Sequence, residues 1–237
     1  MIEEICQCIY EKADGIGLGH FVWCPVTHLD EVPRILEVER AASEAHYATR
    51  FHISQMNGNH FKAKQKLPVK ALSLGDTEEL IISKAKKRPC LVLACNNTSF
   101  KDPMILSEIK NKRHLQDESM ILAPIFGSAT PDDEKGFPPI MVARIRVFLY
   151  KQFFYLPESC PKTKTKIGKE SVARLDRLFA ASPNRGVTPM GIKLSDEPLL
   201  LLMALLRERF GTTPDENLKT VREILDSSLP DHCRPNA

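Results

Sequence analysis

The sequence predicts an α+β protein in which a small antiparallel β-barrel is flanked by N-terminal and C-terminal helices. Short apolar runs bounded by Pro, Gly and Asn dominate residues 67–156 and predict strands there. Apolar residues recur at helical spacing before this region, at 30–51, and after it, from 168 to 225. A hydrophobic content of 43% with 27% charged residues is typical of a soluble globular protein.

The central element is a predicted strand over residues 90–94, Cys-Leu-Val-Leu-Ala. Pro89 has no N–H to give to a neighbouring strand, so we expect it at the first position of this strand. Arg88 then lies at the strand entrance, beside a stiff residue. The two Leu side chains should share one face of the strand, with Val92 on the other. A second strand is predicted over residues 120–126, Met-Ile-Leu-Ala-Pro-Ile-Phe.

Further strands are predicted on both sides of this pair. Those that precede it cover residues 20–26, 67–74 and 80–82. After the pair, residues 140–155 form a β-rich run that we expect to make two strands with a bend near Tyr150. On such a strand Arg144 and Arg146 share one face by period two, which is either solvated or part of a groove for a polyanion.

Four helices are predicted from capping signals and apolar spacing, over residues 30–51, 168–180, 195–211 and 213–225. Ser195 and Gly211 are typical of the start and end of the third helix, and Thr213 opens the fourth as part of a capping box. An apolar stripe of the third helix should face the core: Leu199, Leu202, Met203 and Leu206. The longest apolar run, 199–206, lies in this helix and is too short to span a bilayer.

The distribution of charged, Cys and His residues indicates which ligands and which cell compartment to expect. Residues 61–90 hold eight Lys or Arg against three acidic residues, which suits phosphate groups or a solvated face. The seven Cys have poor spacings for a metal, and with no export signal at the N-terminus we expect reduced thiols in a cytoplasmic protein. Spacings of six and eight residues between His46, His52 and His60 do not favour a metal site either. We expect no metal ion and no cofactor.

The order of two motifs resembles the PemK/MazF family of toxin ribonucleases. Arg88-Pro89 precedes one hydrophobic strand, and a later strand ends in Ala123-Pro124-Ile125. The resemblance covers roughly residues 68–180. It implies an SH3-like barrel with a C-terminal helix, whose place the predicted helix at 169–180 takes.

This resemblance divides the chain into three parts. They are an N-terminal extension packed on the core (1–66), a PemK/MazF-like barrel (67–180) and a C-terminal helical extension (181–237).

The resemblance also implies a metal-independent cleavage of RNA, in which the ribose 2′-OH attacks the adjacent phosphate. Such a site needs a proton acceptor, a proton donor and a cation on the phosphorane. Arg88 matches the arginine of the family. The family's late Thr or Ser matches Phe126, so Ser128 or Thr130 would have to replace it. Of the family loop that folds over RNA, only Ser83 and Lys84 remain in this chain.

Two hypotheses from different classes follow. In the first, the chain is a catalytically degenerate PemK/MazF-like protein that binds a protein partner, an antitoxin-like or sequestered regulator, in a toxin–antitoxin or anti-phage defence setting. In the second, it is a metal-independent endoribonuclease toxin that cleaves single-stranded RNA. A homodimer fits both, and neither involves a membrane. Either ligand would contact the same basic residues: Lys84, Lys86, Lys87, Arg144 and Arg146.

Overall fold

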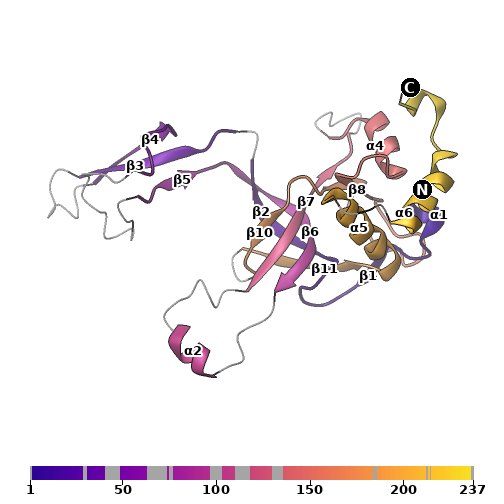
Figure 1. The fold of residues 1–237 in the computed structure, drawn as a ribbon, viewed down its shortest axis with the longest axis horizontal. Helices are drawn as coiled ribbons and strands as arrows, with labels where there is room; N and C mark the ends of the chain where they lie inside the picture. Colours follow the sequence, from indigo (N-terminus) through magenta and orange to yellow (C-terminus); the bar gives the residue numbers. More distant parts are fainter. Residues whose placement is uncertain are drawn as a thin grey trace. The chain divides into compact units, whose positions relative to one another are not determined.

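The computed structural model of the chain shows an α+β fold built mostly of antiparallel strands (Figure 1). It describes residues 2–28, 31–40, 49–62, 74, 77–96, 103–109, 118–129, 136–183, 186–211, 213 and 215–235. The chain forms two compact units, which we describe separately. Unit 1 comprises Met1–Pro25 and Lys87–Ala237, and unit 2 comprises Val26–Lys86. The domain bounds expected at residues 66 and 180 remain predictions.

An eight-stranded sheet forms the centre of unit 1. Its strands in spatial order are β1 (Tyr10–Lys12), β11 (Thr188–Leu194), β2 (His20–Thr27), β6 (Ala85–Asn96), β7 (Ser119–Gly127), β9 (Ser171–Arg174) and β8 (Phe153–Leu156). A further strand, β10 (Phe179–Ala181), also pairs with β7. The registers described are antiparallel, and the strand order runs openly from β1 to β8.

The two central predicted strands are confirmed as β6 and β7, which pair with each other. Leu91 and Leu93 belong to the main core, and Val92 is buried on the opposite side of the strand. The expected position of Pro89 is wrong, because β6 begins at Ala85. The described pairs with β7 begin only after Pro89, so its missing N–H takes no bond from this ladder. The predicted strands at 20–26 and 80–82 are confirmed as well.

Helix α4 (Pro139–Arg146) lies where the sequence predicts a strand. Pro139 occupies the first turn, where its fixed φ suits a helix and its missing N–H has no partner to lose. Val142 and Ile145 lie one turn apart and are both buried. Residues 140–155 are therefore not two strands: β8 is the only part of this run described as strand. Burial at helical spacing outweighs the β propensity of the branched residues.

The predicted helix at 168–180 is also wrong, because this segment forms β9, a turn and β10. Val172 and Leu175 are spaced as on one helix face, and both are buried. In the structure β9 lies between β7 and β8, so its backbone groups bond to strands on both sides. This pairing overrides the local helical pattern.

The same core as the sheet receives buried residues from helices α1 (Ile2–Ile5), α5 (Asp196–Arg209) and α6 (Glu216–Asp226) and from the 3₁₀ turn η2 (Asp231–Cys233). Ser195 and Gly211 flank α5 as predicted, but the Ser195 hydroxyl bonds to the carbonyl of Cys8 instead of capping the helix. The cap of α6 is Asp215, whose carboxylate accepts the N–H of Asn217, and not Thr213.

The expected stripe of α5 is confirmed in part. Leu202 and Leu206 are buried, whereas Leu199 and Met203 are half-buried. Leu205 adds a buried position that the stripe did not include. Among the described helices, which also include α2 (Pro103–Ile109), none is long and apolar enough to cross a membrane.

Unit 2 contains a three-stranded antiparallel sheet in the order β4 (Thr49–Gln55), β3 (Arg34–Arg40) and β5 (Leu80–Ile82). The helix predicted over 30–51 is therefore wrong in its described parts, 31–40 and 49–51, and the rest of it lies outside the described residues. Apolar residues at 35, 36 and 38 fit both periods, and β3 finds a partner strand on each side. The predicted strand 67–74 lies outside the described residues apart from Leu74.

Candidate functional site

The guanidinium of Arg88 lies over the aromatic ring of Phe126, with 4.4 Å between its central carbon and the ring centroid. The register of β6 and β7 explains this contact. Cys90 pairs with Pro124, and two further residues along each strand lead to Arg88 and Phe126. The charge therefore faces the electron-rich face of the ring, which is a cation–π contact. Arg88 is half-buried, and no carboxylate of the described chain forms an ion pair with it.

A second arginine contacts the same ring. The guanidinium carbon of Arg174 lies 5.7 Å from the ring centroid of Phe126 and 5.6 Å from that of Phe153. Asp176 accepts two hydrogen bonds from Arg174, at 3.0 Å and 2.5 Å. Burial opposes ionisation of Asp176, but these bonds outweigh it and lower its pKa. The charge of Arg174 is thus neutralised within the chain, unlike that of Arg88.

The register of β7, β9 and β8 places these groups on one face of the sheet. Phe126 pairs with Val172, which in turn pairs with Tyr155. Paired residues of antiparallel strands point to the same side. Arg174 and its partner Phe153 follow on that side by period two. We call these five residues, Arg88, Phe126, Phe153, Tyr155 and Arg174, the arginine–aromatic face. Phe153 and Tyr155 are buried beneath it, and Arg88, Phe126 and Arg174 are half-buried and reach solvent.

A hydrogen-bond network around one carboxylate, that of Glu170, lies beside Tyr155. One oxygen of Glu170 accepts hydrogen bonds from Arg146 and from the Tyr155 hydroxyl, the latter at 2.6 Å. Its other oxygen accepts the Ser128 hydroxyl at 2.9 Å. Arg146 also lies over the Tyr155 ring, at 5.1 Å from its centroid. The four residues form a connected network centred on Glu170.

The network holds Glu170 as an anion. Its burial disfavours the charge, but the bonds from Tyr155, Arg146 and Ser128 outweigh burial and lower its pKa. The pKa of Tyr155 is raised, first by burial and then by its bond to Glu170. Ser128 is 6% exposed, and its hydroxyl donates a hydrogen bond to this weakly basic carboxylate. The hydroxyl is therefore ordered for structure and not activated for proton transfer.

The predicted catalytic residues are brought together only in part. Arg88 contacts Phe126, the residue at the position where the resemblance implies a Thr or Ser. Ser128 bonds to Glu170, and no contact between it and Arg88 is described. Thr130 lies outside the described residues.

The predicted basic groove divides into separate groups. Arg144 and Arg146 lie two residues apart on helix α4, so they do not share a face as predicted. Arg144 donates to the carbonyls of Cys233 and Arg234 and holds the C-terminal segment. The three lysines of the predicted groove are all exposed. Lys87 belongs to unit 1, and Lys84 and Lys86 belong to unit 2. Lys84 pairs with Glu31 at 3.0 Å within unit 2.

The predicted site lacks Arg174, Glu170 and Tyr155. All three positions depend on β9, whose sequence has the spacing of a helix. A signal was present: Arg174 and Asp176, two residues apart, are typical of a charged turn after a strand. That signal does not by itself place Arg174 over Phe126.

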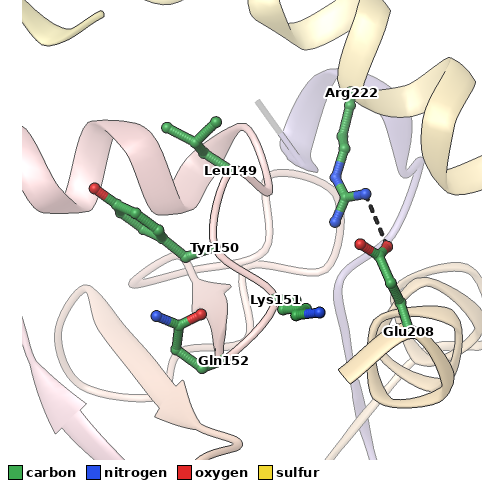
Figure 2. A pocket seen from close by; sticks show the side chains of 6 residues that line it. All are labelled: Leu149, Tyr150, Lys151, Gln152, Glu208 and Arg222. Atoms are coloured by element: carbon green, nitrogen blue, oxygen red, sulfur yellow. Dashed lines mark hydrogen bonds and ion pairs between the residues drawn. The ribbon is translucent and has the colours of Figure 1, made fainter. Parts of the chain in front are cut away.

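An open pocket of about 420 Å³ lies elsewhere in unit 1, next to α5 and α6. Figure 2 shows its lining residues, with the ion pair between Arg222 and Glu208 at one side. Nη1 of Arg222 and Oε2 of Glu208 lie 2.8 Å apart. The charge of Arg222 is balanced by Glu208, and the charge of Lys151 is screened because this lysine is exposed to solvent. The pocket therefore offers no concentrated charge to a ligand.

No group of three metal-ligating side chains that could hold an ion is found in the described part of the chain. Glu37 in unit 2 instead accepts from Ser54 and pairs with His52 and His60. Comparisons with protein-family models, curated proteins and solved structures find no match to this chain.

Proposed function

We propose that this chain is a PemK/MazF-like protein without nuclease activity, which binds an acidic segment of a protein partner through the arginine–aromatic face. The SH3-like barrel and the toxin–antitoxin or anti-phage setting belong to the same proposal. The observation that carries it is the stacking of Arg88 on Phe126. At the position where the resemblance implies a hydroxyl, the chain has an aromatic ring that orients the arginine.

The chemistry of the surrounding groups favours binding over catalysis. Cleavage of RNA by its own 2′-OH requires both a proton acceptor and a proton donor beside the phosphate. The hydroxyl of Ser128, the residue directly after β7, is bonded to Glu170. Asp176 is engaged with Arg174. The described residues around Arg88 thus supply a cation and an aromatic surface, without a free acid–base pair.

A carboxylate is a suitable ligand for Arg88. The planar guanidinium can donate two parallel hydrogen bonds to one carboxylate, and its orientation on the ring limits the entropy lost on binding. Arginine and aromatic residues are also the types that dominate protein interfaces energetically. An extended acidic peptide lying along this face would pair with Arg88, while its apolar side chains contact Phe126.

The alternative is a metal-independent endoribonuclease. The combination of arginine and aromatic rings favours it, because single-stranded nucleic acids stack their bases on such groups. The exposed Lys87, next to Arg88, would contact the backbone phosphates.

One experiment separates these functions. Purified full-length protein is titrated, at moderate salt, into a fluorescent extended peptide of alternating Glu and Leu, and separately into an oligouridine RNA in EDTA. We expect peptide binding that weakens about tenfold in Arg88→Ala, as for the loss of one charged hydrogen bond. Arg234→Ala, an exposed arginine outside the face, is the matched control. RNA cleavage to cyclic-phosphate ends by the wild type but not by Arg88→Ala would establish the nuclease instead.

A further inference from the structure

Two cysteine sulfurs that are not part of the arginine–aromatic face lie close together. Sγ of Cys8 is 3.7 Å from Sγ of Cys160. Cys8 follows helix α1, and Cys160 lies in the loop after β8, 152 positions later in the chain. The pair is independent of the residues used for the proposed function.

The surroundings of Cys160 favour its thiolate. Its sulfur accepts the backbone N–H of Ile9 at 3.3 Å and that of Thr163 at 3.5 Å. Burial opposes ionisation, but these hydrogen bonds outweigh it and lower the pKa of Cys160 to about 6. The thiolate is the nucleophilic form of cysteine. Burial and the contact with Cys160 instead raise the pKa of Cys8, so Cys160 is the thiolate of the pair. Burial also raises the pKa of Cys6, to about 12, and that of Cys95.

Both backbones are held in place. The Ser195 hydroxyl donates to the carbonyl of Cys8 at 2.5 Å, and the Thr163 hydroxyl donates to that of Tyr10 at 2.8 Å. Cys160 donates its own N–H to Thr165 at 2.9 Å. The sulfurs must therefore approach each other by side-chain movement, from 3.7 Å to the bonded distance of about 2.05 Å.

The two cysteines differ in access. Cys160 is 0% exposed, whereas Cys8 is partly exposed. A bulky reagent can reach Cys8 alone. Exposed Lys162 and Lys164 lie in the loop of Cys160, so an anionic reagent is attracted to this place.

We propose that Cys8 and Cys160 form a thiol-modification site that takes an anionic low-molecular-weight disulfide, such as glutathione disulfide, and becomes a disulfide itself. Cys8 first passes its proton to the Cys160 thiolate beside it. The Cys8 thiolate attacks the reagent, forms a mixed disulfide and expels one glutathione thiolate, which then takes the proton back from Cys160. The Cys160 thiolate then attacks Cys8 Sγ and expels the second thiolate. The two protein thiols lose two electrons, and the reagent is reduced by two electrons to two thiols.

The test treats the reduced, folded, full-length protein with glutathione disulfide, blocks free thiols and maps peptides without reduction. We expect a Cys8–Cys160 linkage in the wild type. Cys160→Ser should stop at a mixed disulfide on Cys8, and Cys8→Ser should leave Cys160 unmodified. Cys95→Ser, which removes another partly exposed thiol, should behave as the wild type does. The linked form should melt about 10 °C higher, because the bond closes a long loop.

Two results would overturn the proposal. One is glutathione on Cys8 of the wild type with no linkage to Cys160. The other is modification of Cys95 as fast as that of Cys8, which would show ordinary exposure and no special site. If Cys160→Ser does not fold, Cys8→Ser still decides, because modified Cys160 in that folded variant would contradict the buried, resolving role.

Discussion

Arg88 and Phe126 lie on neighbouring strands, with the guanidinium carbon 4.4 Å from the ring centroid. The ring restricts the orientation of the arginine and leaves its hydrogen-bond donors available, since no carboxylate of the described chain pairs with them. In the proposed function, the ring is therefore as important as the charge.

Phe126→Leu tests this role of the ring. Leucine keeps an apolar side chain but has no π face, so Arg88 loses about 0.5–2 kcal/mol of cation–π attraction and its fixed orientation. We expect about 2- to 30-fold weaker binding of the acidic peptide by fluorescence anisotropy, with circular dichroism unchanged. Phe179→Leu, at a half-buried aromatic of β10 without a described cation contact, should bind normally. Equal binding by both variants would remove the ring from the site.

Glu170→Gln tests the carboxylate network through acid stability. The folded-state pKa of Glu170 is lowered, so its ionised form stabilises the fold above the unfolded pKa of about 4.3, and this contribution is lost as pH falls through the folded pKa. At neutral pH we expect Gln to cost about 1–3 kcal/mol, because Arg146 loses its charged partner.

Urea unfolding at about pH 7 and about pH 3 measures both parts of this expectation. The wild type should lose more stability on acidification than Glu170→Gln does. Asp176 has a lowered pKa as well, so the variant should retain some acid dependence. Asp176→Asn provides the parallel control. Equal losses in the wild type and Glu170→Gln would mean that the network does not hold a charged Glu170.

The sequence predicts the strands whose local signals agree with their pairing. Residues 90–94 and 120–126 are short apolar runs with boundary residues, and they form β6 and β7. Their order also places Arg88 near Phe126. Residues 168–180 carry apolar residues at helical spacing, and only the neighbouring strands make them β9 and β10. Arg174 is the last residue of β9, and Phe153 and Tyr155 pair with β9. Three of the five residues of the arginine–aromatic face therefore depend on pairing that local patterns do not contain.

Leu202→Asp tests the packing of α5 on the sheet. Leu202 is 0% exposed and belongs to the main core, so an aspartate there would be a buried charge without a partner. We expect insoluble protein on expression. Leu200, two residues earlier on the same helix, is 69% exposed, and Leu200→Asp should stay soluble with a melting temperature near that of the wild type. Soluble, normally melting Leu202→Asp would contradict this packing.

Arg222→Ala tests the bond network between α6 and the loop after α4. Its Nε donates to the carbonyl of Phe148 at 2.9 Å. Its Nη1 pairs with Glu208 at 2.8 Å (Figure 2). Phe148 has a φ of 56°, a left-handed conformation that a non-glycine residue keeps only when its surroundings hold it. Removing Arg222 leaves this carbonyl and the Glu208 charge without their donor, so we expect a cost of about 1–3 kcal/mol.

Thermal unfolding of the wild type, Arg222→Ala, Lys219→Ala and the double variant with Glu208→Ala separates the cost of the lost hydrogen bond from that of the unpaired charge. A loss of 1 kcal/mol lowers Tm by about 2–4 °C in a chain of this size, so Arg222→Ala should melt several degrees below the wild type. Lys219→Ala, on the same helix, removes only an exposed pair with Glu216 and should melt near the wild type. Adding Glu208→Ala to Arg222→Ala should recover part of the loss, because the half-buried, unpaired charge of Glu208 is then gone. A double variant that melts lower than Arg222→Ala would show that Glu208 stabilises the fold through other contacts, and that the stranded charge is not the cause.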